Sequence, residues 1–363
     1  MPTILKSTSF PRVSRPRCIL DHQSQFLSSL LEPNQAVSLM VKSNNPKKEM
    51  TLLNPTDTSP NLEQPGRFLR ANMTVNHDPE SIVNEPGHGF LGHLASCIQR
   101  YPYRGRQQFL VDFEAERHRH RTNTSGHVSE WFLLTGVDNL IFRSEFIDPV
   151  DQNTPWTSWD SYDAHLQLLL VKMTKSPAHE TASMTFHKIF LEAVEPTELK
   201  RSLKEIGSAT HFASLGAKEP DQAWRPHQLP FNRSRDWPSA VVEVAYSEIE
   251  SKLASSVRFW MGASGGDVKV VLTLRINRQQ PEIRIEKWVS SSSSSNNNRH
   301  RLDQSVTISK ADSNRIILSN APLTTDFEDL FLRPATIPRE RDIELDAEKL
   351  QYLATEIWDD QGF

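Results

Sequence analysis

The sequence contains only two cysteines, Cys18 and Cys97, in 363 residues. Two cysteines cannot make a disulfide framework or a cysteine-based zinc site, and this scarcity fits a reducing compartment. No apolar run approaches the roughly 20 residues that a membrane-spanning helix needs, and no signal peptide is recognisable at the N-terminus. We therefore expect an intracellular protein, cytoplasmic or nuclear, with no membrane partner.

An excess of positive charge is also missing, since the net charge is −4 and the isoelectric point is about 6.4. Proteins that coat nucleic acid by bulk attraction are usually basic, so any contact with DNA or RNA must come from a local patch. The basic run Arg117–Arg121 is one such patch, although charge runs are usually solvated surface. Glycine is scarce at 13 residues and proline plentiful at 23, which favours long proline-broken stretches over many tight turns.

The first 155 residues show little sustained hydrophobic periodicity, and five prolines between Pro33 and Pro65 interrupt them. We predict a weakly structured, poorly ordered N-terminal region over residues 1–155. Within it, the short apolar segment Gln107–Phe113 is a strand candidate. Trp131–Phe146 supplies further strand candidates that would pack on the second half.

From Trp156 onward the pattern predicts one α/β domain over residues 156–363. Its clearest unit begins at Ser239–Tyr246, whose valines and alanines indicate a strand buried on both faces. A helix from Ser247 and a strand at Asp267–Ile276 follow with short joints, which predicts a parallel crossover. Further strands are expected at 166–173, 211–215, 282–289, 305–309 and 316–319, and further helices at 178–194, 197–206 and 347–358. The predicted fold is a mixed central sheet flanked by helices, with a C-terminal β extension.

One carboxylate stands out because Glu243 lies inside the apolar strand SAVVEVAY. A carboxylate there is costly to desolvate unless it is paired, bound to a metal or placed at the mouth of a site. Asp221 follows a proline about twenty residues upstream. Two converging carboxylates can hold Mg²⁺, which prefers oxygen ligands. Such a metal stabilises the charge that develops on a phosphodiester and activates an attacking water.

These segments resemble the PD-(D/E)xK nuclease superfamily. The resemblance rests on EPDQAW at Glu219–Trp224 and WPSAVVEVAYSE at Trp237–Glu248, and extends to PAHETAS at Pro177–Ser183, to Phe259-Trp260 and to APLTTDFEDLFLRP at Ala321–Pro334. Uncharacterised fungal proteins related to the bacterial putative-restriction-endonuclease family are the most similar group. The resemblance covers Trp156 to the end and implies a restriction-endonuclease-like fold.

The resemblance also implies roles for individual residues. Asp221 would match the aspartate of the first half-motif and Glu243 the acid of the second, both as Mg²⁺ ligands. Glu180 would match the helix acid that completes many such sites. The standard lysine position, two residues after the second acid, is Ala245 in this chain. Lys252, on the following helix, is then the candidate that stabilises the phosphate.

Each of these residues has an ordinary structural interpretation as well. Asp221 after proline is common turn chemistry, and Glu180 suits the positive end of its helix. A lysine on a helix, such as Lys252, is usually exposed to solvent. Lys218 and Lys269 are alternative candidates for the basic residue of the site.

Three functions follow from these observations. The leading hypothesis is a Mg²⁺-dependent phosphodiesterase acting on DNA or RNA. The alternative is a catalytically inactive nuclease-fold module that binds protein or nucleic acid, which Ala245 and the acidic net charge favour. A remote alternative is nucleotide-cofactor binding at Gly87–Gly92, which matches GxGxxG with Asp112 twenty residues further on. The fingerprint requires a strand running into the first glycine, and Pro79 and Pro86 interrupt that approach.

Overall fold

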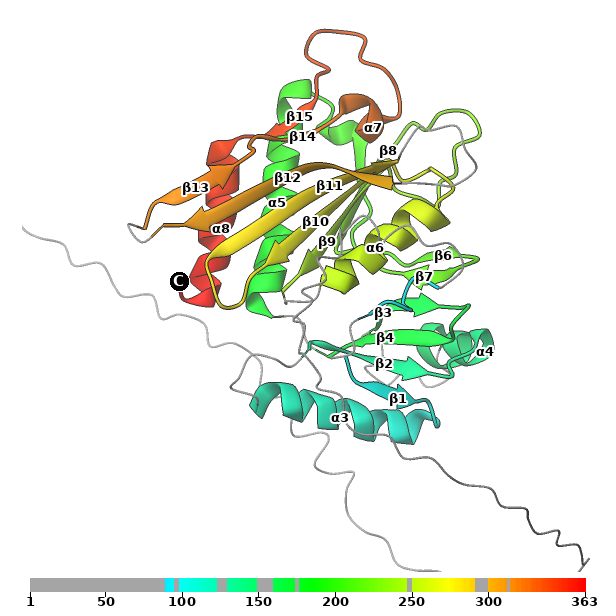
Figure 1. Cartoon of the computed structure of the whole chain (residues 1–363). Helices are drawn as coiled ribbons and strands as arrows, with labels where there is room; N and C mark the ends of the chain where they lie inside the picture. Colours follow the sequence, from blue (N-terminus) through cyan, green and yellow to red (C-terminus); the bar gives the residue numbers. More distant parts are fainter. Residues whose placement is uncertain are drawn as a thin grey trace, which may run out of the picture. The chain divides into compact units, whose positions relative to one another are not determined.

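The computed structural model describes residues 89–94, 98–122, 129–148, 159–173, 176–246, 250–290, 300–311 and 314–363 (Figure 1). The contacts divide the chain into two units, residues 1–72 and 73–363, and every described residue belongs to the second. None of the helices within these ranges is long and apolar enough to cross a membrane.

The first layer is a six-stranded sheet. In spatial order its strands are β1 (Arg100–Pro102), β2 (Trp131–Thr135), β4 (Leu168–Lys172), β3 (Trp159–Asp163), β7 (Gly216–Lys218) and β6 (His211–Ala213). Only the β1–β2 pair is parallel. Helix α3 (Arg106–Thr122), the short helix α4 (Asn139–Ile141) and the π-helical turn η2 (Phe142–Ile147) lie next to it along the chain. Phe132 and Phe146 of this layer pack against Phe109 of α3.

This layer corrects two predictions. The segment Gln107–Phe113, predicted as a strand, belongs to α3, because Phe109 and Phe113 are one helical turn apart and both contact Phe132. The predicted boundary at residue 155 is not a structural division, since β2 pairs with β4 across it. Residues 1–88 of the predicted weakly structured region lie outside the described residues.

The second layer is a seven-stranded sheet. Its order is β13 (Ile316–Ser319), β12 (His300–Lys310), β11 (Glu282–Ser290), β10 (Val270–Ile276), β9 (Ala240–Ala245), β8 (Gln222–Pro226) and β5 (Leu203–Glu205). The β9–β10 pair is parallel and the other pairs are antiparallel. Helix α6 (Glu250–Ala263) connects the parallel pair. The protein therefore has the mixed α/β architecture, with helices flanking a mixed sheet, that the sequence predicts.

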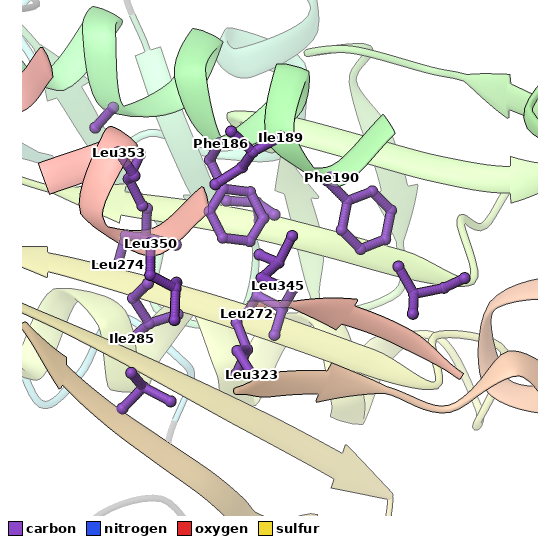
Figure 2. Close-up of a cluster of buried hydrophobic side chains, with 14 of the residues drawn as sticks. Phe186, Ile189, Phe190, Leu272, Leu274, Ile285, Leu323, Leu345, Leu350 and Leu353 are labelled. Carbon is purple, nitrogen blue, oxygen red and sulfur yellow. The ribbon is translucent and has the colours of Figure 1, made fainter. Parts of the chain in front are cut away.

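Helices α5 (Pro177–Val194) and α8 (Ala347–Gln361) cover one face of the seven-stranded sheet. Figure 2 shows how Phe186, Ile189 and Phe190 of α5 meet Leu272 and Leu274 of β10. The short strands β14 (Leu323–Thr325) and β15 (Ile343–Leu345) and the helix α7 (Phe327–Phe331) complete this core. Buried side chains of this size each stabilise the fold by roughly 1.5–3 kcal/mol, so this core holds α5 firmly in place.

The helix predicted at 197–206 is wrong. The segment forms two 3-10 turns, η3 (Glu195–Thr197) and η4 (Lys200–Ser202), and then enters β5. Pro196 lies in the first turn, and Glu198 adopts a left-handed conformation with φ 61° that ends it. A helix cannot continue through such a residue. Ser247, where the sequence predicts the start of the helix after β9, lies outside the described residues.

The opposite face of the seven-stranded sheet packs on α6 and on the first layer. Trp260 and Val257 of α6, Val241 of β9, and Leu133 and Leu170 of the six-stranded sheet belong to one buried cluster. Glu243 of β9 and Lys252 of α6 are buried as well. The candidate site therefore lies between two layers of strands rather than at an open edge.

Candidate functional site

Asp221 stands where the chain passes from the first layer to the second, between β7 and β8. Its amide nitrogen donates to the Val242 carbonyl oxygen at 3.2 Å, and its Oδ2 accepts a hydrogen bond from the Val244 nitrogen at 2.8 Å. These two backbone contacts flank Glu243, so the sequence motif does bring the two predicted acids to one stretch of β9.

The Glu243 carboxylate points to α6 and has no exposed surface. Its Oε1 accepts a hydrogen bond from Trp260 Nε1 at 2.6 Å, and its Oε2 accepts one from Ser256 Oγ at 3.1 Å. The ammonium groups of Lys252 and Lys218 each lie 3.3 Å from the same Oε2. Both carboxylate oxygens are therefore occupied by donors from the protein itself.

Asp160 of β3 completes this arrangement. Its Oδ2 lies 2.9 Å from Lys218 Nζ, its Oδ1 lies 3.1 Å from Lys252 Nζ, and the Ser161 hydroxyl donates to Oδ2 at 2.6 Å. Asp160, Lys218, Glu243 and Lys252 form a buried group of two carboxylates and two ammonium groups, called the ion tetrad below. Two members come from the six-stranded sheet and two from β9 and α6.

Electrostatics within the tetrad favour the charged forms. Burial by itself raises the pKa of Asp160, but Lys218 and Lys252 outweigh it and hold that pKa below its usual range. Burial likewise lowers the pKa of Lys252, but the carboxylates of Asp160 and Glu243 outweigh it and raise that pKa. In this network Asp160 and Lys252 stay ionised because groups of opposite charge face them.

Asp221 contacts a second set of charges. Its Oδ1 lies 3.4 Å from His179 Nε2 and 3.7 Å from Lys172 Nζ. These two cations outweigh the effect of burial and hold the pKa of Asp221 well below its usual range. Burial lowers the pKa of His179, but Asp221 outweighs burial and raises it. Glu180, whose side chain is 43% exposed, lies 3.6 Å from His179 Nδ1.

The structure thus places the four predicted site residues in two neighbouring groups. Lys252 and Glu243 belong to the tetrad, whereas Asp221 and Glu180 meet at His179. Lys252 links the groups, since Asp221 also contributes to its raised pKa. Of the alternative lysines considered from sequence, Lys218 is in the tetrad and Lys269 donates to the Gly266 carbonyl oxygen instead.

Sequence reasoning missed Asp160, Lys172, His179 and Glu130. Glu130 is buried, which raises its pKa, and its Oε1 lies 2.8 Å from Arg278. The signal that identified Glu243 was a charge inside an apolar strand. The same signal is present at Lys172, which ends the apolar strand LLLVK.

These residues do not fit a magnesium ion. No group of three or more His, Cys, Asp and Glu side chains in the described part of the chain is arranged to hold a metal. A cation beside Glu243 would have to displace Lys218 and Lys252, which already neutralise it. Mg²⁺ keeps several waters when it binds, and a carboxylate without exposed surface leaves no room for them.

The glycine motif at Gly87–Gly92 does not fit a nucleotide phosphate either. Gly87 lies outside the described residues, and Gly89 begins a turn closed by Gly92, whose nitrogen donates to the Gly89 carbonyl oxygen at 3.1 Å. A Cβ on Gly89 would lie 2.2 Å from the buried Asp163 carboxylate, which accepts the Leu91 amide at 3.0 Å. The close approach at this glycine serves a carboxylate of the protein, whose charge would repel a phosphate.

Comparisons with known proteins add little. No family model matches the chain, and no curated protein matches it. Among solved structures, one similar chain is a putative nuclease belonging to DUF820 from Anabaena variabilis, at 8% identity and a TM-score of 0.29, covering 51% of this chain and 87% of that one. A similarity at that level carries no argument about activity. The fold and the site themselves define a mixed α/β protein with a buried ionic core.

Proposed function

We propose that this chain is a catalytically inactive module of the PD-(D/E)xK nuclease-like type, which binds a protein partner instead of hydrolysing phosphodiester bonds. The observation that carries the proposal is the environment of Glu243. Both oxygens accept donors from Trp260 and Ser256, and Lys218 and Lys252 stand within 3.3 Å. In the nuclease hypothesis this same carboxylate would have to face a metal ion and a substrate.

The covering layer is joined to the second layer at three places along the chain. The chain passes between the layers three times, from β4 to α5, from β5 to β6, and from β7 to β8. To open the site, the sheet that carries Asp160 and Lys218 would have to move away from the seven-stranded sheet, and all three connecting segments would have to allow that movement. Breaking a buried ion pair costs about 3–5 kcal/mol, which a substrate would have to supply before any chemistry began.

Charge and exposed aromatic residues favour a protein partner over nucleic acid. The net charge is −4, so the electrostatic attraction that dominates nucleic-acid binding is weak. Phe231, in the loop between β8 and β9, is 94% exposed, and Phe212 of β6 is 50% exposed. Exposed aromatic side chains are enriched where proteins bind each other.

The decisive experiment tests for hydrolysis. Purified full-length protein is incubated with single-stranded DNA, duplex DNA and RNA in Mg²⁺ or Mn²⁺, beside Glu243→Gln and Glu180→Gln. We expect no metal-dependent cleavage that either substitution removes. Glu180 is half-exposed, so its variant keeps the fold even if the Glu243 variant does not. Cleavage that Glu180→Gln lowers would support the Mg²⁺-dependent phosphodiesterase and overturn the inactive module.

Binding is tested with a matched pair of surface substitutions. Phe231→Asp removes the exposed ring, and Val111→Asp introduces the same charge at a helix position that is also exposed. Proteins that co-purify with the wild-type chain are quantified for both variants. A partner lost with Phe231→Asp alone supports the proposal. Saturable binding of DNA or RNA at physiological salt, with no such protein, contradicts it.

A further inference from the structure

Among the residues that the structure describes, strand β13 lies at the edge of the seven-stranded sheet and pairs with β12 alone. Ile317 pairs with Ser309 and Ser319 with Thr307. The Ala311 nitrogen donates to the Arg315 carbonyl oxygen in the same register. Because hydrogen-bonded and non-hydrogen-bonded pairs alternate in antiparallel sheets, the N–H and C=O groups of Ile316 and Leu318 point away from the sheet.

The other edges of the two larger sheets, in the part of the chain that the structure describes, are protected. β1 carries Arg100 and Pro102, and β5 carries Lys204 and Glu205. β6 has three residues, and its His211 Nδ1 contacts the Asp236 carbonyl oxygen at 2.5 Å. Charges, proline and short length are the devices that keep edge strands from pairing.

Strand β13 has none of the charge or proline that protects the other edges, since its sequence is Ile-Ile-Leu-Ser. Ile316 and Leu318 pack against the core, so Ile317 points to the opposite face, where it is 39% exposed. Its neighbours on that face of β12, Ser309 and Thr307, are polar. An exposed isoleucine on a polar, unprotected edge is the pattern of a strand that accepts another strand.

We propose that two copies of this chain pair through β13 as antiparallel strands, which joins their seven-stranded sheets into one. The strand is complementary to itself in one register. Ile316 faces the partner's Leu318, Leu318 faces the partner's Ile316, and the two-fold axis passes between Ile317 and the partner's Ile317. All outward N–H and C=O groups of Ile316 and Leu318 are then used. Neighbouring side chains in the central, non-hydrogen-bonded pair approach closely.

The ends of the strand fit this register. Asn314 before β13 and Asn320 after it adopt left-handed conformations, with φ 60° and 62°. These residues turn the chain away from the strand direction. The pairing is therefore limited to Arg315 and the four residues of the strand, Ile316–Ser319. Because such a contact is much smaller than a standard protein interface, the dimer should be weak and depend on concentration.

The test is sedimentation equilibrium of the full chain over a concentration series. Ile317→Lys places two like charges opposite each other across the two-fold axis and should weaken dimerisation roughly tenfold or more. Ile337→Lys is the matched control, because Ile337 is 40% exposed and lies outside the strand. Mixing Ile317→Lys with Ile317→Glu should restore association, since opposite charges then face each other.

Hydrogen exchange supplies a second readout that does not depend on any variant. The amides of Ile316 and Leu318 should gain protection as the wild-type concentration rises. A wild-type chain that stays monomeric at every concentration overturns the proposal and leaves the edge to a strand of another protein. A dimer whose association constant is the same in Ile317→Lys overturns it too, because another surface must then form the contact.

Discussion

The Trp260 indole donates from Nε1 to Glu243 Oε1 across 2.6 Å, and neither side chain has exposed surface. Trp260 lies on the face of α6 that packs on β9. The contact orients the carboxylate so that its other oxygen meets Ser256, Lys218 and Lys252. Trp260 is therefore both a core residue and the hydrogen-bond donor that orients the Glu243 carboxylate within the ion tetrad.

Replacing that indole tests how much the hydrogen bond contributes. Trp260→Phe removes the donor and leaves a charged acceptor unsatisfied, which costs about 1.5–3 kcal/mol beyond the loss of packing. Trp224→Phe is the control, because Trp224 is equally buried and its Nε1 is buried without a hydrogen bond among the described residues. Urea unfolding should show the larger loss for Trp260→Phe. Equal losses would mean that the hydrogen bond adds nothing to packing.

The ion tetrad predicts an unusual result for Glu243→Gln. If Glu243 is structural, the substitution leaves the buried Lys218 and Lys252 in contact with the Asp160 carboxylate but without that of Glu243. It should therefore lower the free energy of unfolding by about 3–5 kcal/mol. A functional acid would behave differently, because removing one from an active site usually leaves stability unchanged or raises it. Glu344→Gln, at an exposed position of β15, is the control and should change stability by less than about 0.5 kcal/mol.

Coupling within the tetrad can be measured with a double variant. Lys252→Met removes one ammonium group, so Glu243→Gln combined with Lys252→Met leaves Asp160 and Lys218 as a balanced pair. The double variant should be more stable than the sum of the single losses by about 1–3 kcal/mol. Additive losses would show that Lys252 and Glu243, 3.3 Å apart, do not stabilise each other.

Stability should also depend on pH in two windows. The pKa values of Asp160 and Asp221 are lowered in the fold by their cationic neighbours. Their contribution is present above the unfolded value of about 4 and is lost as pH falls below it. The pKa of His179 is raised by Asp221 against burial. Its contribution is present below about pH 6.5 and is lost as pH rises through the folded value.

One substitution distinguishes the loss of stability at alkaline pH from the loss at acid pH. His179→Gln should remove the loss of stability on the alkaline side and keep the loss on the acid side, which urea midpoints between about pH 3 and pH 9 would record. His118→Gln, on the exposed side of α3, is the control. An alkaline decline of unchanged size in His179→Gln would show that other groups cause it.

The sequence predicts the parts of this fold whose secondary structure follows from the local sequence pattern. The strand Ser239–Tyr246 is apolar along most of its length, Glu243 excepted, and the helix after it has a clear apolar stripe, so β9, α6 and β10 were all predictable. Helix α3 was not, because Gln107–Phe113 read in isolation has the composition of a strand. Phe109 and Phe113 are spaced as on a helix, but one such pair does not establish a helical period in a seven-residue segment of a helix that runs to Thr122.

Glu243 and Lys252 of the ion tetrad could be singled out from the sequence, whereas Asp160 and the pairing of the four side chains could not. Glu243 could be identified because a carboxylate in an apolar strand needs a partner. Which partner it takes depends on how β3 and β7 meet β9 and α6. That contact brings Asp160 and Lys218 next to Glu243 and Lys252, which are distant in the sequence. No local sequence pattern predicts such a contact. Lys252 was a candidate from the resemblance alone, and its contacts with Asp160 and Glu243 appear only in three dimensions.

The glycine at position 89 offers a test of what the Gly87–Gly92 segment does. Its Cβ would meet the Asp163 carboxylate, which is buried and accepts amides from Leu91 and His165. Gly89→Ala should therefore lower the thermal midpoint, since the carboxylate cannot move without losing these bonds. Gly262→Ala is the control, because a Cβ there meets nothing within 4 Å and lies in helix α6, where alanine stabilises by roughly 0.5–1 kcal/mol.

A nucleotide-binding loop predicts instead that NAD or FAD raises the midpoint of the wild type and that Gly89→Ala abolishes the rise. We expect no shift with either cofactor, and a saturable shift would contradict the structural role of Asp163.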